Sequence, residues 1–202
     1  QGTSNGEPLW SPDGTKIVWV AYRNLNLDIY VMNSDGTGET RLTYYVGQDK
    51  DPVWSPDGTK IAFSSLRDAN TDIYVVNSDG TGEIRLTYDP KINQQPDWSP
   101  DGARITFLSR RHGNAEIYMI NADGTGESRV TNHPGETDNP VWSPDNTKIA
   151  YWGQQGGDYQ IFVINPDGSG QVSVTDYPGS HRHPVWSPNG SKIAFESLRD
   201  NH

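Results

Sequence analysis

A tryptophan that recurs every 44 residues constrains the fold of this chain more than any other feature. Its five copies are Trp10, Trp54, Trp98, Trp142 and Trp186. Each is followed by Ser-Pro, and a second motif, which reads Asp-Ile-Tyr-Val-Val-Asn-Ser-Asp-Gly at residues 72–80, follows at a fixed offset. A constant period without insertions indicates one small structural unit that is stacked repeatedly. We therefore expect a single domain over residues 1–202, with repeats that start near residues 7, 51, 95, 139 and 183.

The pattern inside one repeat predicts four short strands. An extended segment at residues 52–54 leads into the Ser-Pro-Asp-Gly turn of residues 55–58. Residues 60–64 alternate in a strand-like way, residues 73–76 are apolar throughout, and residues 83–87 form a more polar strand. With no helical period anywhere, this unit predicts an all-β fold, a β-propeller of four-stranded blades. The fixed place of the tryptophan before a turn favours a buried core residue over an exposed sugar-stacking platform.

The two motifs do not occur equally often. There are five Trp-Ser-Pro units but only four copies of the Ile-Tyr-type unit. The sequence therefore predicts four full blades plus a half blade, and so an incomplete ring. An unpaired strand edge beside residues 192–195 is a template for association. Either the chain is a piece of a longer protein, or the half blade pairs with strands of another subunit.

The repeated motifs resemble those of a known protein family. Pro-x-Trp-Ser-Pro-Asp-Gly-x-x-Ile-Ala-Phe, then Asp-Ile-Tyr-Val-x-Asn-x-Asp-Gly, then Arg-Leu-Thr resemble the WD-repeat-like β-propeller repeat of TolB-type proteins, over residues 7 to 199. The resemblance implies radially arranged blades and protein–protein binding in the periplasm or outside the cell. The same repeat also appears in the propeller that caps some serine peptidases. TolB-type propellers have six blades, which at this period need more chain than is present.

Composition excludes several classes of function. A net charge of -10, without a Lys/Arg-rich run, argues against nucleic acid and anionic membranes as partners. The absence of cysteine excludes disulfides, thiol catalysis and cysteine-ligated zinc. No apolar run approaches the ~20 residues of a membrane span, so we expect no membrane insertion. No catalytic or metal-ligating set is recognisable, and we expect a protein that is not an enzyme and has no cofactor.

Calcium is a metal that the sequence leaves open. The Asn-x-Asp-Gly-x-Gly-Glu turns of residues 33–39, 77–83 and 121–127 place oxygen atoms at close intervals. Calcium takes ~6–8 oxygen ligands, more than one such turn offers. Asp and Asn also hydrogen-bond the backbone of their own turns, which favours turn chemistry.

Strand direction divides the loops between two faces. The Ser-Pro-Asp-Gly and Asp-Gly-Thr-Gly turns lie on one face and are nearly constant between repeats. The loops between the second and third strands, expected at residues 22–26, 66–70, 110–114 and 154–158, lie on the other face with the connections between blades, and both vary. Binding residues tend to sit on loops that a rigid scaffold holds. The variable face is therefore the candidate recognition face, unless its loops differ only because nothing constrains them.

Two groups of residues on the variable face are candidates for partner binding. The residue before the proline of each innermost strand should lie nearest the propeller axis and form a polar channel mouth: Glu7, Asp51, Gln95, Asn139 and His183. Aromatic residues in or near the loops are typical of protein-binding surfaces: Tyr45, Tyr88, Trp152 and Tyr177. A conserved offset between repeats also predicts that Arg23 and Arg67 pair with Asp28 and Asp72.

These patterns predict a non-enzymatic, exported interaction or assembly module whose variable face binds a protein partner. Two alternatives remain. One is a propeller fragment of a serine peptidase, whose channel filters peptide substrates. The other is a self-assembling extracellular protein, joined to copies of itself through the open half blade and perhaps stabilised by calcium.

Overall fold

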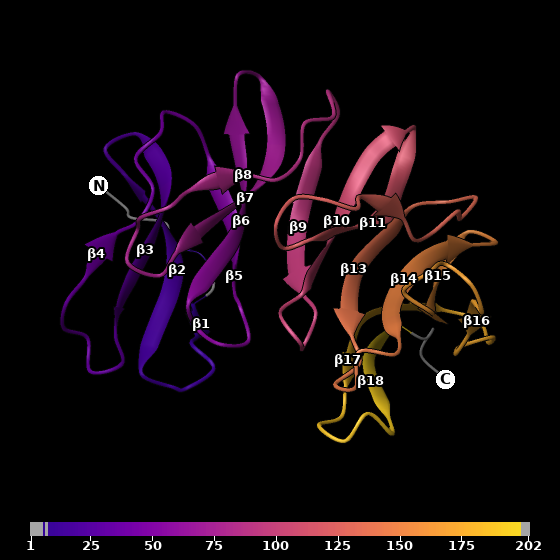
Figure 1. The fold of residues 1–202 in the computed structure, drawn as a ribbon. Helices are drawn as coiled ribbons and strands as arrows, with labels where there is room; N and C mark the ends of the chain where they lie inside the picture. The colour runs from indigo at the N-terminus through magenta and orange to yellow at the C-terminus, as the bar shows by residue number, and fades with distance from the viewer. Residues whose placement is uncertain (1–5, 7, 199–202) are drawn as a thin grey trace.

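The computed structural model describes residue 6 and residues 8–198, and it confirms the all-β propeller. Four four-stranded antiparallel sheets and one two-stranded sheet follow one another along the chain (Figure 1). The first two sheets contain β1 (Leu9–Trp10), β2 (Lys16–Arg23), β3 (Asn26–Asn33), β4 (Thr40–Arg41), and β5 (Asp49–Trp54), β6 (Lys60–Arg67), β7 (Asn70–Asn77), β8 (Ile84–Arg85). The next two contain β9 (Asn93–Trp98), β10 (Arg104–His112), β11 (Asn114–Asn121), β12 (Ser128–Arg129), and β13 (Thr137–Trp142), β14 (Ile149–Gln155), β15 (Asp158–Ile164), β16 (Val172–Ser173). The last pairs β17 (Ser180–Trp186) with β18 (Ile193–Leu198).

Each sheet is one blade, and its strands pair in chain order. The innermost strands β1, β5, β9, β13 and β17 contact one another in succession, as do the faces of neighbouring sheets. Within residue 6 and residues 8–198 there is no helix long and apolar enough to cross a membrane.

The connections between the second and third strands are shorter than the sequence suggests. Most residues of the expected loops continue the strands, because β2 pairs with β3 as far as Arg23 and Asn26. The turn between them is only Asn24-Leu25, and both residues have a positive φ, as the two central residues of a type I′ hairpin turn require. Asp68-Ala69 repeats this geometry. The prediction of five-residue loops was therefore wrong, because in the first two blades the turn is only two residues long.

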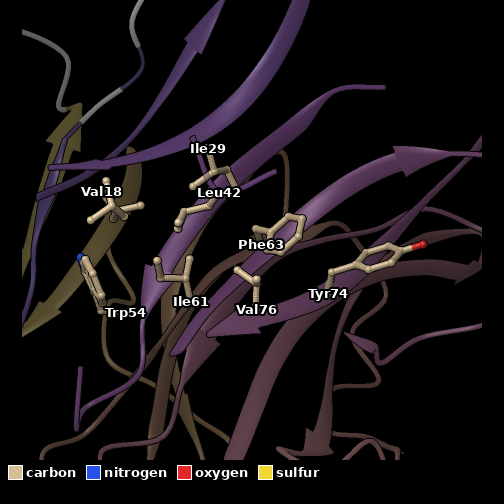
Figure 2. Packing of buried hydrophobic residues seen from close by; sticks show 9 residues of the cluster. Val18, Ile29, Leu42, Trp54, Ile61, Phe63, Tyr74 and Val76 are labelled. Carbon is tan, nitrogen blue, oxygen red and sulfur yellow. The ribbon is translucent and has the colours of Figure 1, made fainter. Parts of the chain in front are cut away.

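The core lies between blades. In the first interface Val18, Ile29 and Leu42 of one blade pack against Trp54, Ile61 and Phe63 of the next (Figure 2). The second interface repeats this arrangement with Trp98, which is 5% exposed. The Trp54 indole Nε1 also donates a hydrogen bond to the Leu9 carbonyl across the interface, at 3.2 Å. The tryptophans of the second, third and fourth units are thus core residues, as predicted.

The prediction was wrong for the two end copies, because Trp186 is only half-buried and Trp10 is exposed. Trp10 occupies the same repeat position but is 60% exposed. Every buried copy packs against the blade that precedes it, and no described blade precedes the first one. Trp10 therefore lacks the cover that a preceding blade gives to the buried copies.

Candidate functional site

The constant face is made of turns that satisfy their own polar groups. In the turn of residues 55–58 the Asp57 carboxylate accepts hydrogen bonds from Ser55 Oγ at 2.6 Å and from the Thr59 backbone N–H at 3.0 Å. The equivalent bonds lower the pKa of Asp13 to about 2. Because these side chains are used within the turn, they are constant for a structural reason.

The Asp-Gly-Thr-Gly turns of the same face are also held by hydrogen bonds within the turn. Asp79 Oδ1 accepts bonds from the Thr81 hydroxyl at 2.7 Å and its backbone N–H at 2.9 Å, which lowers the pKa of Asp79. Glu83, the last candidate oxygen ligand of this turn, forms an ion pair with Arg67. Calcium would have to displace these partners, and its binding here stays a prediction.

The Arg67–Glu83 pair corrects one expectation. Arg23 pairs with Glu39 at 2.5 Å in the same way, so neither arginine pairs with Asp28 or Asp72. Those carboxylates pair with Arg41 and Arg85 of the outermost strands, at 2.9 and 2.7 Å. The reason is strand pairing, because β4 and β8 lie against β3 and β7 and bring their arginines beside the buried acids.

The variable face carries exposed aromatic and apolar side chains at its inter-blade connections. Tyr88 is 71% exposed, and Tyr44, Tyr45 and Val46 of the preceding inter-blade connection are 68, 45 and 91% exposed. Sequence reasoning did not single out Val46, although it belongs to the same connection as Tyr44 and Tyr45.

Arginines hold these rings in place. The guanidinium carbons of Arg41, Arg67 and Arg85 lie 4.7, 4.7 and 4.8 Å from the ring centroids of Tyr44, Tyr45 and Tyr88. Each arginine is also tied into an ion pair. The stacking fixes the rings before any partner arrives, which reduces the entropy lost on binding.

The other two predicted aromatics are less exposed. Trp152 on β14 packs edge-on against Tyr159, with centroids 4.8 Å apart, and Arg182 lies over both rings. Tyr177 packs edge-on against the buried ring of His181. Both therefore help to join the fourth blade to the two-stranded sheet.

Three of the five residues predicted to form the channel mouth lie together in the structure. Asp51, Gln95 and Asn139 line one cavity of about 390 Å³ among the innermost strands. His183 lies on β17, is exposed, and its Nδ1 is 2.9 Å from Glu196 Oε2. Glu7 lies outside the described residues.

These channel residues share an unusual backbone. Asp51, Gln95, Asn139 and His183 have φ angles between 51° and 54°, the left-handed region that favours glycine. Each lies where the pairing of the innermost strand shifts register, as in a β-bulge. Such strained positions gather at functional sites when the surrounding structure holds them in place. Asp, Asn and His are the non-glycine residues that adopt this conformation most readily, and Gln95 is the departure from that preference.

Sequence reasoning missed Asp97, which lines the same cavity. The equivalent residues of the other repeats are Leu9, Val53, Val141 and Val185. Burial raises the pKa of Asp97 to about 7, although the nearby backbone of Trp142 and Trp98 favours its charged form. A comparison of the repeats position by position would have found it.

Comparison with known proteins decides the family. The sequence matches the TolB beta propeller domain over residues 1–112 and again over residues 89–202. The chain belongs to this family. It is 40% identical over 40 residues to the Tol-Pal system protein TolB of Thioalkalivibrio sulfidiphilus, which covers 20% of this chain and 9% of that protein.

Solved structures agree with the TolB-type fold. TolB from Acinetobacter baumannii superposes with a TM-score of 0.78 at 25% identity, over 95% of this chain and 48% of that one. The chain thus spans about half of that TolB chain and a smaller part of the curated relative.

Enzymes also share the fold. An oligogalacturonate lyase in complex with manganese has a TM-score of 0.78 at 15% identity, over 97% of this chain and 60% of that one. Dipeptidyl peptidase 4 of Porphyromonas gingivalis has a TM-score of 0.70 at 11% identity, over 93% of this chain and 33% of that one. At such identities the likeness concerns the fold alone.

Proposed function

We propose that this TolB-type propeller is a non-enzymatic interaction module that binds a protein partner through its variable face, in the periplasm or outside the cell. The observation that carries the proposal is the set of exposed, arginine-stacked tyrosines on the inter-blade connections. Tyrosine and arginine are the residues that most often dominate protein interfaces. The relative in Thioalkalivibrio sulfidiphilus is a Tol-Pal system protein, which supports a role in a protein assembly.

A double substitution on this face tests the proposal. Tyr45→Ala with Tyr88→Ala removes two exposed rings, and each ring of this kind contributes about 1–2 kcal/mol to an interface. We expect the immobilised variant to retain at most about a tenth of the partner that the wild-type chain captures from an envelope extract of the source cells. Quantitative mass spectrometry of the captured proteins measures this.

The matched control removes apolar surface elsewhere. Ile84 and Val172 are exposed on the outermost strands β8 and β16, away from the connections. Ile84→Ala with Val172→Ala should leave capture unchanged. Equal capture by wild type and the tyrosine variant would contradict the proposal, as would an equal loss in the control.

Association of copies is a second candidate, because both ends of the blade series expose apolar surface. Trp10 is 60% exposed on the first blade and Leu198 is 70% exposed on β18. Within the described chain β18 pairs only with β17, whereas the equivalent strands of the other blades pair on both sides. If copies join here, sedimentation velocity will show a concentration-dependent species that Trp10→Ser weakens. A monomer at all concentrations would rule out this candidate.

A further inference from the structure

A cavity of about 410 Å³ lies where the first blade meets the second. Its apolar walls come from both blades: Leu9, Val20, Leu27 and Pro52. Lys50, at the start of the second blade, also lines it. The volume falls in the range of sites that bind small ligands or single side chains. We call this cavity the first-blade slot and define it by Val20, Leu27 and Lys50.

The fourth blade shows what occupies the same place when larger side chains are present. Three periods of 44 residues further along the chain, the equivalent positions hold Trp152, Tyr159 and Arg182. The two rings pack edge-on with centroids 4.8 Å apart, and the Arg182 guanidinium carbon lies 4.0 Å from the Tyr159 centroid. Two rings and a cation therefore fill in the fourth blade the positions that surround a cavity in the first.

The second blade carries a polar version of the slot. Ser64 and Thr71 stand at the positions of Val20 and Leu27, and the cavity that they line has a volume of only about 110 Å³. The scaffold thus accepts different contents at this place. In the first blade the walls are apolar and the space is open, which suits a ring that comes from outside the chain.

Lys50 supplies the electrostatic part of the slot. Its side chain is exposed, and it forms no ion pair in the part of the chain that the structure describes. A lysine ammonium is attracted to the negative face of an aromatic ring. Leu27 forms a β-bridge with Gln48, which ends the connection that carries the exposed Tyr45. The slot is therefore joined to the surface that carries the exposed rings.

We propose that the first-blade slot binds an aromatic side chain of the protein partner, with its ring between Val20 and Leu27 and under Lys50. Tyr159 lies under Arg182 in the same way in the fourth blade. Burial of the apolar ring drives binding, and the cation orients its face. The inference rests on the proposed partner binding at the variable face, and it adds the kind of side chain that the partner presents.

Titration with N-acetyl-tryptophanamide tests the slot without the partner. The protein is labelled at its valine and leucine methyl groups, and Val20→Ile and Leu27→Met assign the two resonances. We expect saturable ring-current shifts of both resonances in the NMR spectrum, and no saturable shift with N-acetyl-leucinamide. Equal binding of the leucine compound, no shift with the tryptophan compound, or binding of 3-methylindole alone would overturn the proposal, the last because it indicates a site for a free aromatic molecule.

A filled slot is the decisive variant. Val20→Trp with Leu27→Tyr gives the first blade the residues of the fourth and should abolish binding of N-acetyl-tryptophanamide. Lys50→Met, which keeps the packing of the wall, should weaken the affinity by about 2- to 5-fold. Lys192→Met, which removes an exposed charge on the last sheet, should leave it unchanged. Wild-type affinity in the filled variant or in Lys50→Met would overturn the proposal.

Partner capture separates this proposal from the proposed function. If the filled variant captures the partner as well as the wild type does, while the variant of Tyr45 and Tyr88 has lost it, the slot proposal is wrong and the proposed function stands. If the filled variant loses capture while the tyrosine variant keeps it, the slot proposal stands and the role given to the tyrosines is wrong.

Discussion

Replacing Trp98 by alanine is expected to lower the free energy of unfolding by about 3–5 kcal/mol. The indole is 5% exposed and packs between Ile73 and Leu86 of the preceding blade and Ile105 of its own. Burial of ~200 Å² of aromatic surface contributes about 5 kcal/mol before side-chain entropy is counted. Urea unfolding followed by circular dichroism measures the loss.

The repeat supplies the matched control for this prediction. Trp10→Ala makes the same chemical change at the same repeat position, but Trp10 is 60% exposed. It should cost less than about 1 kcal/mol. Equal costs at the two positions would show that blade packing does not determine the contribution of the tryptophan.

Asp72→Ala is expected to destabilise the fold by about 3–5 kcal/mol, because it leaves several buried donors without a partner. The carboxylate is 2% exposed and accepts bonds from Arg85 at 2.7 Å and Thr87 at 2.9 Å. It also accepts the side-chain amides of Asn70 at 3.0 Å and Asn93 at 3.2 Å. Thermal unfolding at neutral pH measures the effect.

The fourth blade again offers a comparison. Gln160 occupies the equivalent position, is neutral, and accepts the Thr175 hydroxyl at 2.6 Å. No arginine stands at the position of Arg85 there, since Ser173 replaces it. Gln160→Ala should therefore cost about 1–2 kcal/mol, clearly less than Asp72→Ala. A larger loss at Gln160 would contradict the role that we give to the buried charge.

The blade architecture could be predicted from the sequence because a fixed period forces every copy into the same environment. Trp54 and Trp98 were placed in the core on that ground. The same argument fails for Trp10, because its environment comes from a neighbouring blade and not from its own repeat. Periodicity describes the repeated unit but not the ends of the series.

The sequence did not predict the left-handed backbone conformations or the partners of the ion pairs. Gln95 is not a residue type that favours a left-handed conformation, and the register shifts of the innermost strands are not visible in the sequence. Arg67 stands five residues before Asp72, yet it pairs with Glu83 across the blade. Distance along the chain is a poor guide where strand pairing decides which side chains meet.

The sequence predicted which face carries the candidate recognition residues, but not every residue that contributes to it. The variable loops pointed to Tyr45 and Tyr88, and the structure shows both rings exposed under arginine stacking. Asp97 was not predicted because it departs from the repeat pattern inside strand β9 and not in a variable loop.

The stacking of blades through their tryptophans is the claim on which the rest depends. Incorporation of 5-fluorotryptophan, with resonances assigned by single Trp→Phe variants, allows the solvent exposure of each indole to be measured by ¹⁹F NMR with a soluble paramagnetic agent. We predict strong broadening for Trp10 and little broadening for Trp54, Trp98 and Trp142, which are 60, 6, 5 and 5% exposed. Equal broadening of all four resonances would contradict the account.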